Sequence, residues 1–205
     1  MTRLYSTSEI ASKYNRFAKW YDFIEAVFEL FIWRYRKQLL SLARGKVLEV
    51  GIGTGANLRY YSYDCEIIGI DASGEMLNKA RKKAHALGMN AAFVQRDAQR
   101  LPFGNKQFDT VVDTLGLCTY LNPIKALREM KRVCKDEGII LLLEHGVSDR
   151  GWVQRWQERR EKKHYETLGC SLLRNHKHLV RKAGLRIVKA KRNLFGAIYT
   201  IVAKP

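Results

Sequence analysis

The chain has 205 residues, of which 46% are hydrophobic, and its formal net charge is +17 at pH 7. This length and hydrophobic content are enough to bury a substantial core, and no Pro-, Ser- or Gly-rich linker divides the sequence. The sequence contains no internal repeat or low-complexity tract, which excludes a repeat array and predicts one compact domain over residues 1–205.

The N-terminal segment is not predicted to cross a membrane. It lacks the charged, apolar and small-residue segments of a secretory signal. Residues 24–33 are apolar, but Glu25 and Glu29 interrupt them and Arg34 ends them well short of the roughly 20 residues that a span needs. Their helical spacing fits a helix packed on the core, and it also fits an amphipathic anchor at a membrane interface.

A strand-forming run at residues 46–50 leads directly into glycines at alternate positions. Gly51, Gly53 and Gly55 indicate a turn in which the backbone passes close to a ligand. The spacing Gly51-x-Gly53-x-x-Ala56 taken alone also fits the dinucleotide-binding fingerprint. We therefore predict a nucleotide-like cofactor at this turn.

Further strands are predicted at residues 66–70, 91–95, 108–113, 138–144, 185–191 and 196–203, and helices near residues 74–87, 124–134 and 175–183. This alternation predicts a doubly wound, mainly parallel sheet that is covered on both faces. Only four residues separate the last two strands, too few for a crossover, so these strands should pair antiparallel. Asp71 ends the second predicted strand, where a carboxylate can accept both ribose hydroxyls of a nucleoside.

The motifs of this core occur in a recognisable order, which is Glu49, Gly51-x-Gly53-x-Gly55, Asp71, Asp97-Ala98, Leu101-Pro102-Phe103 and Phe108-Asp109-Thr110-Val111-Val112. Over residues 46–145 this order resembles the class I S-adenosylmethionine-dependent methyltransferases. Motifs outside the core extend the resemblance, namely Tyr14-Asn15-Arg16-Phe17-Ala18-Lys19-Trp20-Tyr21-Asp22, Leu117-Cys118, Leu143-Glu144-His145-Gly146, Gly169-Cys170 and Ala183-Gly184-Leu185. They are most similar to quinone-biosynthesis C-methyltransferases, bacterial phosphatidylethanolamine N-methyltransferases and methyltransferase-like thiol methyltransferases.

The resemblance implies a Rossmann-like, seven-stranded α/β fold with an antiparallel last strand. Residues 1–45 would form a helical lid of two helices over the carboxyl ends of the strands, where such sheets bind ligands. Residues 46–145 would form the cofactor-binding core, and residues 146–205 a basic insertion followed by the C-terminal strands.

The resemblance also implies roles for individual residues in binding S-adenosylmethionine. The implied set is Glu49, Gly51, Gly53, Gly55, Asn57, Asp71, Ala72, Met76, Asp97, Ala98 and Leu115. The three glycines let the backbone approach the amino-acid part of the cofactor, while Glu49 organises their loop from beneath. Asp71 would bind the ribose, Ala72 and Met76 would flank the adenine, and Asp97 with its neighbour would read the adenine edge. From the residues alone, Asp71 could instead cap the following helix, and Asp97 could be a plain turn residue.

Candidate catalytic side chains are Tyr14 and Tyr21 from the lid and His145 after the fifth core strand. Most of the acceleration can come from aligning the nucleophile with the methyl group, an effect worth up to roughly 7–11 kcal/mol. A base is needed only if the nucleophile arrives protonated. Each tyrosine could equally pack the helix on the core, and His145 could equally make a structural hydrogen bond.

Two base-methylating chemistries are disfavoured. Asp113-Thr114-Leu115-Gly116-Leu117 lacks the Asp/Asn-Pro-Pro-Tyr/Phe run that similar enzymes use for an exocyclic base amine, and Cys118 is not preceded by proline. The four cysteines, at positions 65, 118, 134 and 170, show no metal-ligand spacing, so we expect reduced, packed thiols, no metal centre and a reducing compartment.

The basic charge is concentrated in one part of the chain. Residues 150–192 hold fourteen Lys/Arg and three Asp/Glu, whereas residues 47–149 hold thirteen of each. Basic residues mixed with Trp152, Trp156 and Tyr165 suit an acidic membrane surface, and they also suit single-stranded RNA. A solvated helix face is the third interpretation.

The sequence thus predicts a methyltransferase that uses S-adenosylmethionine on a small-molecule or lipid-like acceptor, most simply a phospholipid headgroup amine or a quinone-type ring. We expect it in the cytoplasm, with peripheral contact to the inner face of a membrane as one option. The alternative is an RNA-binding methyltransferase, or a non-catalytic rRNA or tRNA assembly factor, that uses residues 150–192.

Overall fold

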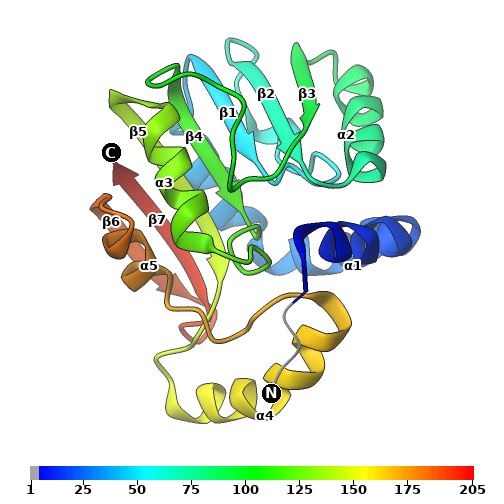
Figure 1. Ribbon diagram of the computed structural model, residues 1–205, viewed down its shortest axis with the longest axis vertical. Helices are drawn as coiled ribbons and strands as arrows, with labels where there is room; N and C mark the ends of the chain where they lie inside the picture. The colour runs from blue at the N-terminus through cyan, green and yellow to red at the C-terminus, as the bar shows by residue number, and fades with distance from the viewer. Residues whose placement is uncertain (1–4) are drawn as a thin grey trace.

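The computed structural model describes residues 5–205, apart from the side chains of residues 16–26 (Figure 1). Seven strands form one sheet, in the order β3-β2-β1-β4-β5-β7-β6. The strands are β1 (Lys46–Val50), β2 (Glu66–Asp71), β3 (Ala91–Gln95), β4 (Phe108–Thr114), β5 (Cys134–His145), β6 (Arg186–Asn193) and β7 (Ile198–Lys204). Strands β1 to β5 pair parallel, and β7 pairs antiparallel with both β5 and β6. The predicted doubly wound sheet with an antiparallel last strand is confirmed.

The helices cover both faces of the sheet. They are α1 (Thr7–Leu40), α2 (Gly74–Ala86), α3 (Pro123–Val133), α4 (Gly151–Leu168), α5 (His176–Lys182) and the short 3₁₀ helix η1 (Leu58–Tyr60). One apolar cluster joins α3 and α5 to the sheet face that Val111 and Leu142 occupy, and both helices lie in front of the sheet in Figure 1. A second cluster joins α2 and the C-terminal part of α1 to the opposite face, around Val112 and Leu141. The alternation of neighbouring residues between the two clusters follows from the period of two along a strand.

The lid is one helix of 34 residues, and the expectation of two helices before Lys46 was wrong. The helix begins with a capping box, in which Ser6 and Glu9 satisfy each other's backbone N–H groups. No Gly or Pro occurs between Thr7 and Leu40, so nothing in this segment breaks the helix. It runs from the carboxyl end of the sheet onto the sheet face (Figure 1).

The apolar side chains of residues 24–33 divide between core and surface. Ile32 is fully buried, whereas Leu30 and Phe31 are 72% and 59% exposed. Phe28 and Trp33 are also exposed, and Ile24 lies outside the described side chains. One row of this helix therefore packs on the core, whereas most of the described apolar side chains of residues 24–33 face solvent. Among the described residues, no helix has the length and apolar character needed to cross a bilayer.

Helix α4 is not among the helices that the sequence predicts. Gln157 is its only fully buried residue among the described side chains, so the helix shows no apolar stripe of the usual kind. It lies beyond the carboxyl ends of the parallel strands, next to the N-terminal part of α1 (Figure 1). Together these two helices cover the edge of the sheet at which sheets of this kind bind ligands.

Candidate active site

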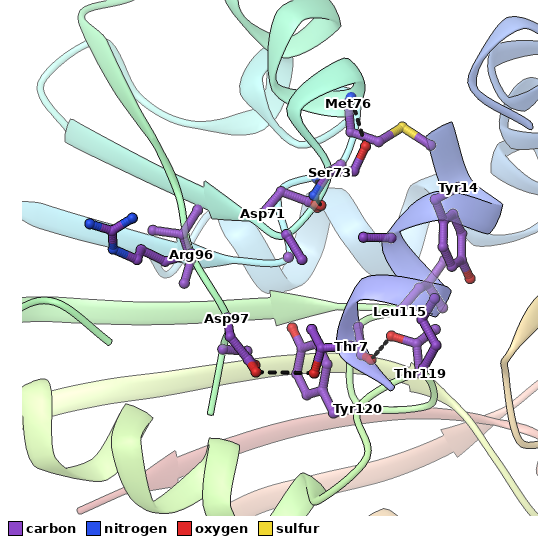
Figure 2. A pocket seen from close by; sticks show the side chains of 18 of the residues that line it. Thr7, Tyr14, Asp71, Ser73, Met76, Arg96, Asp97, Leu115, Thr119 and Tyr120 are labelled. Carbon is purple, nitrogen blue, oxygen red and sulfur yellow. Dashed lines mark hydrogen bonds between the residues drawn. The ribbon is translucent and has the colours of Figure 1, made fainter. Parts of the chain in front are cut away.

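A cleft opens at the carboxyl ends of β1, β2 and β4, under the first turns of α1 (Figure 2). Strand order reverses there, because β1 pairs with β2 on one side and with β4 on the other. Nine of the residues singled out from the sequence line the cleft, namely Tyr14, Gly51, Gly53, Asp71, Ala72, Met76, Asp97, Ala98 and Leu115. The sequence therefore singled out nine of the twenty residues that line the cleft, although the lining does not by itself show what binds there.

The glycines of the loop after β1 serve different purposes. Gly51 and Gly53 line the cleft with positive φ angles of 68° and 56°. A Cβ atom on Gly53 would meet no atom within 4 Å, so its backbone faces open space. Gly55 does not line the cleft, and a Cβ atom there would lie 2.6 Å from Leu58 Cδ1 and 3.3 Å from Ala80. We correct the role of Gly55, because its missing side chain allows the loop to pack against α2.

Glu49 and Asn57 lie beneath the loop and outside the cleft wall. The Glu49 carboxylate accepts hydrogen bonds from Asn57 Nδ2 at 2.7 Å and from the Tyr61 hydroxyl at 2.8 Å. Arg36 donates to the Asn57 side-chain oxygen and, at 3.2 Å, to Thr114 Oγ1. Burial is the main cause that raises the pKa of Glu49 to about 7. Glu49 thus supports the loop, as the resemblance implies, whereas Asn57 belongs to the same support rather than to the cofactor wall.

Asp71 presents its carboxylate to the cleft from the end of β2. One oxygen accepts the backbone N–H of Gly53 at 2.9 Å, and the other accepts that of Ser73 at 2.8 Å. Ser73 is the N-cap of α2, because its side chain accepts the Met76 N–H at 3.1 Å, and Asp71 supports this cap through its bond to Ser73 N–H. Burial raises the pKa of Asp71 despite these bonds. Each carboxylate oxygen retains a lone pair for a further donor such as a ribose hydroxyl.

Asp97 makes hydrogen bonds both within its own turn and to the first residue of helix α1. Its carboxylate accepts Gln99 N–H at 2.9 Å and the Thr7 hydroxyl at 3.0 Å, and Figure 2 shows the second bond crossing the cleft. Across the cleft, Asn15 of α1 contacts the Ser73 hydroxyl. The lid is therefore fastened on both sides of the cleft, by contacts that sequence reasoning missed because the partners are far apart in the chain.

Buried acids organise the cleft floor after β4. Tyr120 donates to Asp113 at 2.7 Å, and Gly116 N–H lies 3.0 Å from Asp113 Oδ1 and 3.2 Å from Glu144 Oε1. Burial raises the pKa of Asp113 to about 6, and burial together with the neighbouring Asp113 raises that of Glu144 further. Both shifts favour a protonated carboxyl group in this pair, which reduces the repulsion between two acids that lie side by side.

A second, apolar cavity of about 430 Å³ adjoins the cleft. Its wall comes from α1, α4 and the ends of β5 and β7, and its apolar lining includes Phe28, Trp156, Leu168, Leu172, Leu194, Ala197 and Ile198. Tyr14 and Leu115 line both spaces, so they stand at the boundary between them. A cavity of this size and character suits a small apolar molecule or the end of a larger amphiphile.

His145 faces this second cavity, not the cleft. Its Nε2 lies 2.9 Å from the sulfur of Cys170, and its main-chain oxygen lies 2.8 Å from His176 Nε2. Burial alone would lower the pKa of His145, but contact with the Cys118 sulfur more than offsets this and raises it. Tyr21, the remaining predicted catalytic residue, is among the residues whose side chains are not described.

Comparison with known proteins agrees with the fold. Residues 48–142 match the family model described as a methyltransferase domain. Over 109 residues the chain is 39% identical to a phosphatidylethanolamine N-methyltransferase of Cereibacter sphaeroides, covering 52% of this chain and 54% of that protein. Over 151 residues it is 32% identical to a demethylmenaquinone methyltransferase of Thermus thermophilus, and the match covers 70% of this chain and 66% of that protein. A solved S-adenosylmethionine-dependent methyltransferase of Thermotoga maritima aligns with a TM-score of 0.72 and 21% identity over 95% of this chain and 99% of that chain.

The sheet has the fold of the Rossmann-like methyltransferases. The sequence matches are more specific, and the chain carries an S-adenosylmethionine-dependent methyltransferase domain, which confirms the resemblance of the motif order. The chain spans about half the length of the first curated relatives that it matches.

Proposed function

We propose that this chain transfers a methyl group from S-adenosylmethionine to an amphiphilic acceptor that occupies the apolar cavity. The observation that carries the proposal is the junction of the two spaces at Tyr14 and Leu115. S-adenosylmethionine supplies a methyl group already activated on a sulfonium sulfur. The chain therefore needs chiefly to align the acceptor with that group and to exclude water.

The cleft residues fit the cofactor in chemical character. The carboxylate of Asp71 has acceptor capacity for two ribose hydroxyls, and the open backbone at Gly53 leaves room for a close approach. Ala72 and Met76 add apolar surface suited to the faces of an adenine ring, and Asp97 with Ala98 is assigned to its edge. We assign the cofactor to this cleft on these grounds.

The lining of the second cavity favours an apolar acceptor with a small reactive head. Related proteins are named for phosphatidylethanolamine and for demethylmenaquinone, and both names describe lipid-like molecules with one reactive end. We infer a phospholipid headgroup amine or a quinone-type ring as the acceptor. Tyr14 stands where the two ligands would meet, so we assign it to positioning the acceptor, while the corresponding role of Tyr21 rests on the sequence alone.

Exposed aromatic side chains line this cavity, and exposed basic side chains lie on the same helix α4, which favours a membrane partner. Trp156 lines the cavity and is 53% exposed, and Phe28 also lines it and is 37% exposed. The exposed face of α4 adds Trp152, Arg155, Arg159, Arg160, Lys162 and Lys163. Indole rings suit the headgroup layer, and basic side chains are attracted to anionic lipids. An acceptor could then pass from the bilayer into the cavity without crossing water.

The test of the methyltransferase assignment is calorimetric titration with S-adenosylhomocysteine. Asp71→Ala removes two charge-assisted hydrogen bonds to the ribose, so we expect its affinity to fall at least about 100-fold. Asp64→Ala, which removes an exposed aspartate, is the matched control and should bind like wild type. Methyl transfer is then followed from labelled S-adenosylmethionine to vesicles that contain phosphatidylethanolamine or a demethylated quinone. Equal affinity of wild type and Asp71→Ala would remove Asp71 from the site, and no binding to wild type would reject the proposed function.

A further inference from the structure

Two thiols and an imidazole meet in the wall of the apolar cavity. Cys118 follows β4, His145 ends β5 and Cys170 follows α4, so three separate segments contribute. The ligand atoms of all three residues lie within 4.8 Å of one another, and His145 Nε2 is 2.9 Å from Cys170 Sγ. The backbone holds this cluster together, because Ser171 N–H donates to the Cys118 carbonyl at 3.0 Å.

The cluster has the donor set of a zinc site, and its ligand atoms lie close to the spacing that such a site needs. Thiolate sulfur and imidazole nitrogen are preferred zinc ligands, and tetrahedral bonds of about 2.3 and 2.0 Å place such atoms roughly 3.3–3.8 Å apart. Small side-chain adjustments would reach that geometry from the observed arrangement. Two thiolates would also neutralise the charge of a divalent ion, which suits an apolar wall.

We propose that Cys118, His145 and Cys170 bind a zinc ion whose fourth coordination position opens into the acceptor cavity. All three side chains line that cavity, so the open position has space in front of it. Zinc sites with three protein ligands and one open position are typical of catalysis, whereas closed four-ligand sites are structural. His164 lines the same cavity, with its ring centroid 6.4 Å from that of His145.

The use of the fourth position rests on the proposed function. A coordinated hydroxyl loses its proton more readily than a free one, so a reduced quinone-type ring held through its hydroxyl would bind as an anion, which makes its neighbouring ring carbon more nucleophilic. The attacking ring carbon then forms the bond to the methyl carbon, and the electron pair of the broken carbon–sulfur bond stays on the cofactor sulfur. The proton on that ring carbon is released to solvent, which restores the aromatic ring. His145 is a metal ligand in this arrangement, which replaces the general-base role considered from the sequence.

The site is tested with Co²⁺ as a spectroscopic probe on the reduced, metal-free full chain. We expect one equivalent to bind with thiolate-to-cobalt charge-transfer absorption and the intense visible bands of tetrahedral Co²⁺, all abolished by added Zn²⁺. Cys118→Ser and Cys170→Ser should each weaken binding at least about 100-fold, since changes outside the ligand set alone cost 10–100-fold. Cys134→Ser, at a buried thiol elsewhere in the fold, is the matched control and should leave the spectrum unchanged.

A wild-type protein without the charge-transfer absorption overturns the proposal, and so does an unchanged spectrum in either serine variant. If circular dichroism shows that one variant does not fold, the other variant and the wild-type titration still decide. Titration of the same samples with S-adenosylhomocysteine separates the two proposals. Binding of this ligand without Co²⁺ binding rejects the metal site alone, whereas failure to bind it rejects the proposed function.

Discussion

At the scale of single residues, Gly53 and Gly55 show that one repeated motif can have two physical causes. Both have positive φ, yet only Gly53 faces the cleft, while Gly55 makes room for Leu58 and Ala80. The motif predicts the backbone conformation of both residues, because φ > 0 favours glycine wherever it occurs. Which neighbour each glycine meets depends on how α2 packs, and that information is not local.

Glu49 makes a prediction at this scale, because its buried carboxyl has a raised pKa of about 7. Folding then favours the protonated form, so the stability it contributes is complete below its unfolded pKa, near 4.5, and is lost as the pH rises through 7. Glu49→Gln keeps an acceptor for Asn57 and can donate to Tyr61, without a titrating group. Between pH 5 and 8, the free energy of unfolding of wild type should fall relative to the variant by on the order of 3 kcal/mol.

Urea unfolding of both proteins at several pH values measures this difference. Glu75→Gln, at an exposed position, is the control for the loss of a carboxylate. Its free energy of unfolding should depend on pH in the same way as that of wild type. Parallel pH profiles for wild type and Glu49→Gln would show that the carboxyl is ionised in the folded state throughout.

At the scale of elements, the sequence predicted that the segment of α1 is helical, but not how long the helix is or which residues it contacts. Its apolar spacing indicates a helix, and the lack of Gly and Pro accounts for its 34 residues. Its contacts with Asp97 and Ser73 could not be predicted, because they join positions more than 50 residues apart. Helix α4 was missed for a related reason, since a helix with polar residues on every side has no periodic apolar signal.

Thr7 makes a prediction about this lid. Its hydroxyl occupies an oxygen of Asp97, a residue that we assign to the adenine edge, so the bond should compete with the cofactor. Thr7→Val keeps the shape of the side chain and removes the donor. With a net hydrogen-bond contribution of about 1 kcal/mol, we expect S-adenosylhomocysteine to bind about fivefold more tightly and to associate faster.

Stopped-flow fluorescence and calorimetry measure the rate and the affinity. Ser12→Ala, at an exposed position of the same helix, should leave both unchanged. Weaker binding by Thr7→Val would mean that the hydroxyl contacts the cofactor instead of competing with it.

At the scale of the whole molecule, the separation of charge matters more than its total. The segment that contains the cleft is balanced, whereas residues 150–192 carry fourteen basic and three acidic residues. The fold brings part of this segment, helix α4, to the wall of the apolar cavity. Cofactor chemistry and attraction to an anionic surface are thus assigned to different parts of one fold.

Charge reversal on α4 tests the membrane surface. Arg159→Glu combined with Arg160→Glu should reduce binding to anionic vesicles at least about tenfold, because each basic residue near such a surface contributes about 1 kcal/mol. Arg181→Glu combined with Lys182→Glu makes the same change in net charge on exposed residues of α5 and should have a much smaller effect. Vesicle sedimentation measures the binding, and filter binding to RNA runs beside it. The nucleic-acid alternative would be favoured by a different result, in which wild type binds RNA but not vesicles and the Arg159→Glu, Arg160→Glu variant loses the RNA binding.

The sequence by itself predicted the sheet and the glycine turn after its first strand, and the order of its motifs indicated the class of chemistry. These features depend on short-range patterns, such as strands followed by glycines or an acid, and each pattern lies within a few residues. The tertiary structure decided how Tyr14 and Leu115 join two cavities and how Cys118, His145 and Cys170 come together. The physical reason is that chain segments with no local relation become neighbours only when packing buries their apolar surfaces against a common sheet.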